Sequence, residues 1–202
     1  SFAVTTENIK NIVSPEFKSA GHKVVMLRPE YTADNLPETA SLLKVYEEVY
    51  ALVTAGKAAA IYTPGMGGVA EAVMKKAFGN GIGVKFAENV TMDELFGHCY
   101  GSFVLEMTGE GAGKVIGETT KVPAMTMGEE SMSLEFLLNQ YENKLESVYP
   151  CNIADAKTPI ETVSFDAASC VAPAIKVAKP KVLIPVFPGT NCEYDSAKAM
   201  TD

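Results

Sequence analysis

The stretch KAAAIYTPGMGGVAEAVMKKAF, residues 57–78, passes from a short apolar run through a glycine-rich turn into an amphipathic segment. Residues 57–62 predict a buried strand. The residues after the turn predict a helix capped by Gly79, because apolar side chains recur on one helical face at Val69, Ala72, Val73, Ala77 and Phe78. A strand that runs directly into a helix indicates a protein in which helices pack on a sheet.

The glycines of this turn, Gly65, Gly67 and Gly68, are candidate phosphate-binding residues. Glycine lets a backbone approach an anion closely, and the free N–H groups of the first helical turn point toward it. The spacing matches neither the dinucleotide fingerprint nor the Walker motif, and it lacks the lysine that would reach the phosphates. The alternative is a tight turn with close helix–sheet packing, which uses the same glycines.

Further strands and helices are predicted on both sides of this stretch. Residues 1–6, 22–27 and 82–86 are typical of strands, and residues 123–127 predict an edge strand. Residues 102–107 and 114–121 predict a hairpin that reverses at the glycine-rich segment 109–113. Residues 37–56 have apolar side chains at helical spacing between a proline and a glycine, and Ser131 or Ser133 is expected to cap another helix.

The last quarter of the chain differs in composition. Residues 148–180 are rich in proline and small residues without a clear period, which is typical of a linker. Residues 181–187, KVLIPVF, predict a new strand, residues 188–192 a turn, and Glu193 the start of a helix. We expect a second domain to begin at residue 181 and to be cut off at residue 202, so that the chain is a piece of a longer protein.

Composition and charge exclude several classes of partner. The chain has 202 residues, 47% of them apolar, and a formal net charge of −8. Nucleic acids and anionic membranes attract clustered lysine and arginine, and the sequence has no such cluster. Its apolar stretches fall far short of the roughly 20 residues of a membrane span. We therefore expect a cytoplasmic protein that binds neither nucleic acid nor membrane.

The sequence offers no complete set of catalytic side chains. Cys192 lies in a turn that opens a helix, where the helix dipole favours a thiolate. A catalytic cysteine needs an activating base, and neither His22 nor His98 lies in the same segment. The four cysteines form no Cys-x-x-Cys pair, so neither a zinc site nor a disulfide framework is predicted. We predict reduced thiols, no catalytic residue and no metal site.

Several segments resemble the C-terminal-type domain of the aminoimidazole-ribonucleotide-synthetase superfamily. They are SFAVT at 1–5, SPEFK at 14–18, GGVAEA at 67–72, AFGN at 77–80 and IGET at 116–119. The segment KVLIPVFPGTNC, residues 181–192, resembles the first strand and loop of class I glutamine amidotransferases. One after the other, the two are similar to the large single-chain form of the phosphoribosylformylglycinamidine synthase family.

The resemblance implies an α+β fold for residues 1–147, with a mixed, mainly antiparallel sheet and packed helices. It implies a linker at 148–180 and a truncated α/β start at 181–202. The activity implied is that of an ATP-dependent carbon–nitrogen ligase of purine biosynthesis, which amidates formylglycinamide ribonucleotide with glutamine as amido donor and uses ATP and magnesium. The implied partners are the other synthetase and glutaminase domains of the same polypeptide, with a homodimer as a further arrangement.

Only some of the site residues that are typical of the family are present in this chain. Where many superfamily members have His-Asp-x-Ser-x-Gly-Gly-Leu, this chain has YTPGMGGV at 62–69, so Gly67 and Gly68 match and the His, Asp and Ser do not. Gly189 and Asn191 match the amidotransferase loop and are expected to border the glutamine pocket. Cys192 does not match the family's nucleophile, which lies downstream. The chain by itself is therefore expected to be inactive.

Two other functions remain open from the sequence. One is a non-catalytic nucleotide-binding or scaffold module that holds a nucleotide at the glycine turn. The other is a small thiol enzyme built on Cys192.

Overall fold

The computed structural model describes residues 2, 4–150, 159, 161–164, 166, 172, 174 and 176–202. The chain divides into two compact units, Ser1–Ala154 and Asp155–Asp202. Most of the linker predicted at 148–180 lies outside the described residues. Among those that are described, no helix is long and apolar enough to cross a membrane.

The first unit is built on one sheet with the strand order β2-β4-β1-β5-β3-β6-β7. The strands are β1 (Lys23–Leu27), β2 (Ala58–Tyr62), β3 (Gly83–Phe86), β4 (Phe103–Met107), β5 (Lys114–Thr120), β6 (Ala124–Met127) and β7 (Glu130–Ser133). All neighbouring strands are antiparallel except β3 and β6, which are parallel. This arrangement confirms the predicted α+β fold with a mixed, mainly antiparallel sheet.

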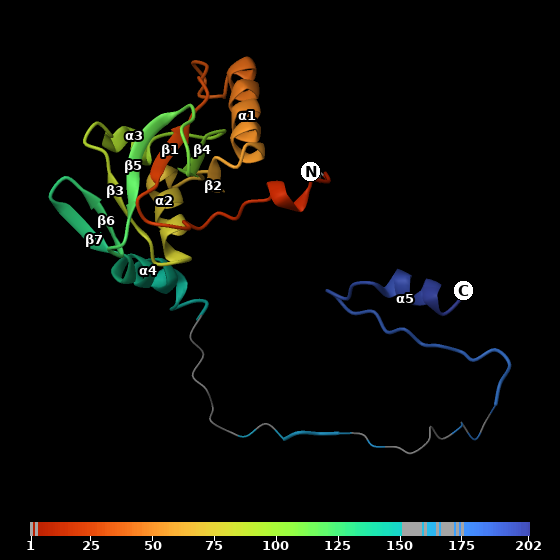
Figure 1. The fold of residues 1–202 in the computed structure, drawn as a ribbon. Helices are drawn as coiled ribbons and strands as arrows, with labels where there is room; N and C mark the ends of the chain where they lie inside the picture. Colours follow the sequence, from red (N-terminus) through yellow and green to blue (C-terminus); the bar gives the residue numbers. More distant parts are fainter. Residues whose placement is uncertain are drawn as a thin grey trace. The chain divides into compact units, whose positions relative to one another are not determined.

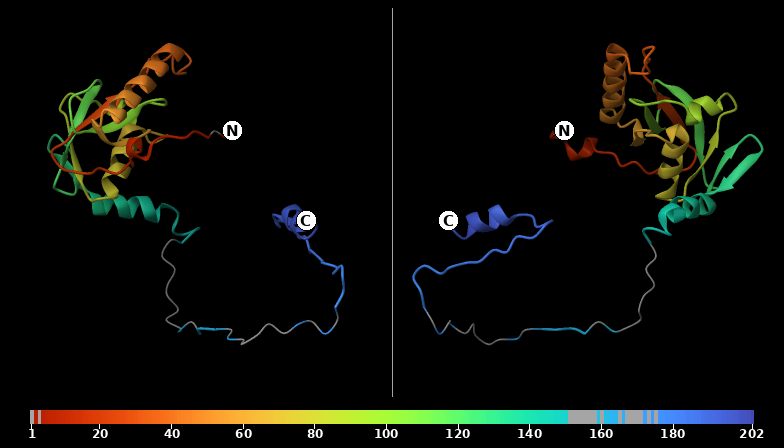
Figure 2. Two further views of the ribbon diagram at one scale, coloured as in Figure 1. Left: turned by 45° about the vertical axis from the view of Figure 1, so that its right-hand side comes forward. Right: turned by 180° about the vertical axis from the view of Figure 1, so that it is seen from behind.

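Helices cover both faces of this sheet (Figure 1). They are α1 (Thr39–Thr54), α2 (Gly68–Phe78), α3 (Met92–Phe96) and α4 (Leu134–Glu142). Val24 and Met26 of β1 belong to the core cluster on the side of α2, α3 and α4, whereas Val25 and Leu27 belong to the cluster with α1. The alternation follows from the two-residue period of a strand and makes β1 the buried centre of both cores. Figure 2 shows α1 and α4 well apart in each view.

The predicted hairpin between 102–107 and 114–121 is wrong. β4 and β5 do not pair with each other, because β1 lies between them and pairs antiparallel with both. β4 and β5 therefore run in the same direction, and the glycine-rich segment between them crosses over β1 instead of reversing the chain. A side chain at Gly113 would lie 2.5 Å from the Cγ1 atom of Val25. The glycines thus permit a close crossing.

Two other strand predictions need correction. Residues 2 and 4–6 form no strand, and Phe2 and Val4 are 92% and 76% exposed. β-branched composition alone does not make a strand without a partner for its backbone hydrogen bonds. The strand predicted at the sheet edge, residues 123–127, corresponds to β6. It does not lie at the edge, because β6 pairs with β3 on one side and with β7, a strand that was not predicted, on the other.

The helix predictions are confirmed, with one omission. α1 ends before Gly56, which has a φ of +66°, and Ser133 caps α4 by accepting a hydrogen bond from the Phe136 amide. Gly79 is the C-terminal cap of α2. The sequence analysis missed α3, although Thr91 and Glu94 form a capping box at its start.

A buried polar network fastens the segment before β1 to the sheet. The Glu106 carboxylate, fully buried in β4, accepts hydrogen bonds from the amides of Lys18 and Ser19 at 2.7 and 3.0 Å. The Nδ1 atom of His22 lies 2.7 Å from the same carboxylate. From α2, the Nζ atom of the fully buried Lys76 donates to the carbonyl oxygen of Pro15 at 2.8 Å. Burial lowers the pKa of Lys76 to about 7.

In the second unit, residues 181–187 have no strand structure. Leu183 and Phe187 are 90% and 69% exposed, so the strand prediction is wrong for this chain, because no strand among the described residues pairs with the segment. The predicted helix is confirmed as α5 (Glu193–Ala199). Its N-terminal cap, Cys192, has a φ of +65°. Assignment of this unit to an amidotransferase domain stays a prediction.

Replacing Lys76 with methionine removes a buried titrating group and keeps an unbranched side chain. Between about pH 7 and 10.5 the unfolded state binds a proton that folded Lys76 lacks, so folding is favoured as the pH rises. The free energy of unfolding of the wild type should therefore rise relative to Lys76→Met across this range, by more than about 1 kcal/mol. Urea denaturation at several pH values measures the difference. Lys85→Met, at an exposed β3 position, controls for the lost charge, and a difference independent of pH would contradict a neutral Lys76.

Candidate functional site

The glycine turn lies between the end of β2 and the start of α2. The amide of Gly68 donates to the carbonyl oxygen of Gly65 at 3.1 Å, which closes the turn. Gly65 and Met66 are exposed, and Pro64 and Gly68 are buried. The three candidate glycines are therefore brought together at the positive end of the α2 dipole, as the sequence predicts.

The chain places a carboxylate of its own at this helix end. The amide of Gly67 donates to Oε2 of Glu71 at 2.8 Å, and Oε1 of Glu71 pairs with the Nζ atom of Lys75 at 2.6 Å. Hydrogen bonds from Lys75 and from the Gly67 amide hold the pKa of Glu71 below its usual value. A phosphate approaching the Gly67 amide would compete with this carboxylate. Neighbouring Lys75 also lies 5.3 Å from the centre of the Tyr141 ring.

Gly68 has a separate structural role. Its φ is +70°, and a Cβ atom there would lie 2.5 Å from the carbonyl oxygen of Leu95 in α3. Close packing of α2 on α3 thus accounts for this glycine without any ligand. A Cβ atom at Gly65, by contrast, would have nothing within 4 Å.

An apolar cavity of about 460 Å³ opens on the same face, where α2 and α3 meet β3, β6 and β7. Four methionines line it, namely Met92, Met125, Met127 and Met132. Met125 and Met132 are directly opposite each other in the β6–β7 pair. Glu130 is the ionisable residue of the lining. The cavity therefore offers mainly adaptable apolar contact.

The described cysteines and histidines form no catalytic set. Burial raises the pKa of the Cys99 thiol, which makes it a poor nucleophile. His98 packs edge-on against Tyr31, with 4.8 Å between ring centres. The ring of His22 contacts the carboxylate of Glu106 in the buried network and does not contact a thiol. Cys192 lies in the second unit and is free and exposed. Cys151 and Cys170 lie outside the described residues.

The described part of the chain has no ready-made site for the magnesium ion that the family resemblance implies. No group of three or more His, Cys, Asp or Glu side chains there could hold a metal ion. The described residues therefore offer no ready-made set of ligands for the metal of a nucleotide, and a phosphate at the turn would have to displace the carboxylate of Glu71.

The two residues expected at the edge of a glutamine pocket lie in the loop before α5. Gly189 has a φ of +91°, and the hydroxyl of Thr190 accepts a hydrogen bond from the Phe187 amide at 3.0 Å. The loop is therefore a defined turn, and Gly189 supplies the backbone conformation that it needs. Its function stays a prediction.

The sequence analysis missed Glu71, α3 and the methionine-lined cavity. Glu71 could have been found, since an acidic residue in the first turn of a helix stabilises the free N–H groups there. The cavity had no such signal, because its walls come from segments that are distant in the sequence.

Comparison with solved structures identifies the fold. No model of a known protein family matches the sequence. The structure resembles a chain of PurLQS from Thermotoga maritima, with a TM-score of 0.58 at 13% identity over 81% of this chain. It also resembles T. maritima PurL complexed with AMPPCP, with a TM-score of 0.57 at 13% identity over 96% of this chain. Phosphoribosylformylglycinamidine synthase II from T. maritima gives a TM-score of 0.55 at 14% identity over 76% of this chain.

This chain spans about a third of the length of these neighbours, covering 32%, 34% and 30% of theirs. The likeness shows that the chain has the aminoimidazole-ribonucleotide-synthetase-like fold. At 13–14% identity this structural likeness establishes the fold of the chain and does not establish its activity.

Alanine substitutions at Gly68 and Gly65 test whether the turn packs on α3 at the first position and faces open space at the second. Gly68→Ala should lower the free energy of unfolding by about 2 kcal/mol or more, because its Cβ meets the Leu95 carbonyl oxygen in a strained backbone conformation. Gly65→Ala is the matched control and should change it by less than about 0.5 kcal/mol. Urea denaturation of both variants provides the measurement. Equal effects at the two positions would show that the turn does not pack on α3 as described.

Proposed function

We propose that this chain is the C-type synthetase domain of a phosphoribosylformylglycinamidine synthase, followed by the start of its glutamine amidotransferase domain. The whole enzyme would be a cytoplasmic ligase that amidates formylglycinamide ribonucleotide with glutamine and ATP. The observation that carries the proposal is the likeness of the fold to T. maritima PurL, with TM-scores of 0.55 to 0.58. The sequence motifs at 67–72 and 181–192 support the same assignment.

In this proposal the chain contributes structure and not the reacting groups. Its described residues hold neither a set of metal ligands nor a thiol hydrogen-bonded to an imidazole. ATP and magnesium would be bound mainly by the other synthetase domains, which are the chain's partners, and a homodimer would be a second arrangement. Gly189 and Asn191 would border the glutamine pocket once the rest of the amidotransferase domain is present.

The reading frame around this sequence tests the proposal directly. A gene that encodes this chain should continue upstream into a partner N-type synthetase half and downstream into a glycine-flanked cysteine. The purified full product should form the amidine from formylglycinamide ribonucleotide, glutamine and ATP, whereas the 202-residue chain should neither hydrolyse glutamine nor form amidine from ammonia. Turnover by the chain alone, or a natural stop codon near Asp202, would contradict the assignment.

We also propose that the turn at Gly65, Gly67 and Gly68 is a phosphate contact that Glu71 competes for. The support is geometric, since the Glu71 carboxylate takes the Gly67 amide at 2.8 Å. Removing the negative charge while keeping the shape should therefore strengthen the binding of a nucleotide phosphate. This part of the proposal can fail without affecting the assignment of the domain.

Calorimetric titration with MgADP tests the phosphate contact. Glu71→Gln should bind MgADP at least about fivefold more tightly than the wild type, since about 1 kcal/mol of repulsion and competition is removed. Glu88→Gln, a charge change outside the turn, should leave the affinity unchanged. An absence of heat in all three proteins would assign the glycines to packing alone.

A further inference from the structure

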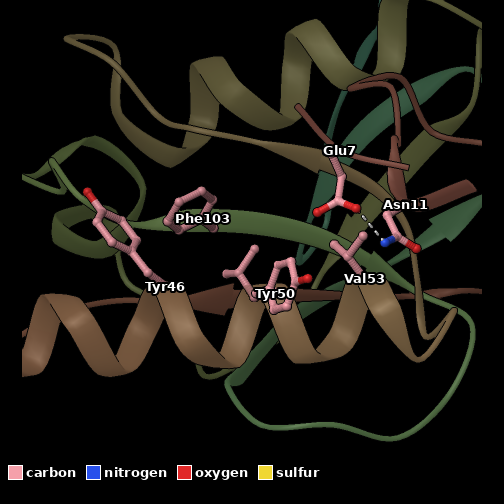
Figure 3. A pocket seen from close by; sticks show the side chains of 7 residues that line it. Glu7, Asn11, Tyr46, Tyr50, Val53 and Phe103 are labelled. Atoms are coloured by element: carbon pink, nitrogen blue, oxygen red, sulfur yellow. Dashed lines mark hydrogen bonds between the residues drawn. The ribbon is translucent and has the colours of Figure 1, made fainter. Parts of the chain in front are cut away.

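A second pocket, on the α1 side of the sheet, has walls of a different chemistry (Figure 3). Its volume is about 270 Å³, and it is lined by residues from the N-terminal segment, α1 and β4. The glycine turn opens α2, whose buried side chains belong to the core cluster on the other face. This pocket is therefore separate from the site considered above, and neither the resemblance nor the proposed function uses it.

Three aromatic rings surround the pocket. Tyr46 and Tyr50 lie one turn apart on α1, and Phe103 opens β4. The rings of Tyr46 and Phe103 are nearly perpendicular, with an angle of 83° and 5.8 Å between their centres. Tyr46 is 47% exposed and Tyr50 is 60% exposed. In such an edge-to-face pair the electron-poor edge of one ring meets the electron-rich face of the other, and the exposed parts of the two tyrosine rings leave electron-rich face area open to a cation.

A carboxylate completes the pocket. Glu7 points toward the rings in Figure 3, and its Oε1 atom accepts hydrogen bonds from the Asn8 amide at 2.7 Å and from Nδ2 of Asn11 at 2.9 Å. Hydrogen bonds from Asn8, Asn11 and the Tyr50 hydroxyl hold the pKa of Glu7 below its usual value. The carboxylate is therefore ionised at neutral pH. No lysine, arginine or histidine lines the pocket among the residues that the structure describes.

We propose that this pocket binds a small organic cation with an N-alkylated ammonium group. Aromatic faces attract such cations, and a carboxylate at the rim adds a direct charge interaction. The lining favours an alkylated nitrogen over a primary ammonium or a metal ion. Val49 and Val53 supply apolar contact for the methyl groups of such a cation. A primary ammonium group has three N–H donors to satisfy, and Glu7 is the one charged acceptor among the lining residues.

The size of the pocket agrees with this ligand class. Drug-sized ligands occupy pockets of roughly 300–1,000 Å³, and this pocket of about 270 Å³ lies just below that range. Cation–π contacts that stay open to solvent are individually weak. With up to three rings and one ion pair, the expected dissociation constant is in the millimolar range.

Titration with choline, followed by NMR on the aromatic protons and valine methyls of the full chain, tests the proposal. The neutral isostere 3,3-dimethylbutanol is the matched control, since it has the same shape without the charge. Choline should shift the signals of Tyr46, Tyr50 and Phe103 and bind at least about fivefold more tightly than the isostere. Sodium chloride at equal ionic strength should give no such shifts. Equal binding of the two ligands, or no shifts with choline, would overturn the proposal.

Two exposed substitutions locate the binding groups. Glu7→Gln and Tyr50→Leu should each weaken choline binding by about threefold or more, because each removes one electrostatic contact. Glu47→Gln, an exposed carboxylate on the same helix, and Tyr194→Leu, an exposed tyrosine in the second unit, are the controls and should leave it unchanged. Unchanged binding in the first two variants, or equal losses in all four, would place the ligand elsewhere.

Discussion

The carboxylate of Glu106 is the constraint on which the first unit depends. It lies in the middle of β4 on the α2 side of the sheet, fully buried, where a charge without partners would be strongly unfavourable. The amides of Lys18 and Ser19 and the ring of His22 satisfy it. The segment before β1 therefore has to wrap over the edge of the core in one conformation, and the backbone oxygen of Pro15 then receives Lys76 from α2.

This anchoring has a consequence for the glycine turn. Lys76 ties the C-terminal part of α2 to the segment before β1, and the first turn of α2 meets α3, where only glycine fits at position 68. The glycines and the helix dipole thus have a structural purpose, while Glu71 occupies the place where an external anion would bind. A phosphate-binding loop and a packing turn use the same backbone, and in this molecule the carboxylate of Glu71 would have to leave the Gly67 amide before a phosphate could take its place.

Local sequence signals predicted most elements but not their arrangement. The spacing of apolar residues located α1 and α2, and a serine cap located the start of α4, because these signals lie within one or two turns of chain. The insertion of β1 between β4 and β5 depends on pairing across the sequence, such as Lys23 with Met107, and adjacency in sequence pointed to a hairpin instead. The same limit applies to the sites, since the three glycines were found in one segment whereas Glu7, Tyr50 and Phe103 meet only in the folded chain.

The central position of β1 also determines the order in which the polypeptide can acquire structure during synthesis. β1 is made before both of its neighbours in the sheet, and about 75 residues separate its end from the start of β4. Until then four buried positions of β1 remain without a sheet, exposed to water and to other nascent chains. Non-local pairing of this kind slows folding and prolongs the time during which aggregation competes. A domain of this topology therefore gains most from chaperones that shield its first strand until β4 and β5 have emerged.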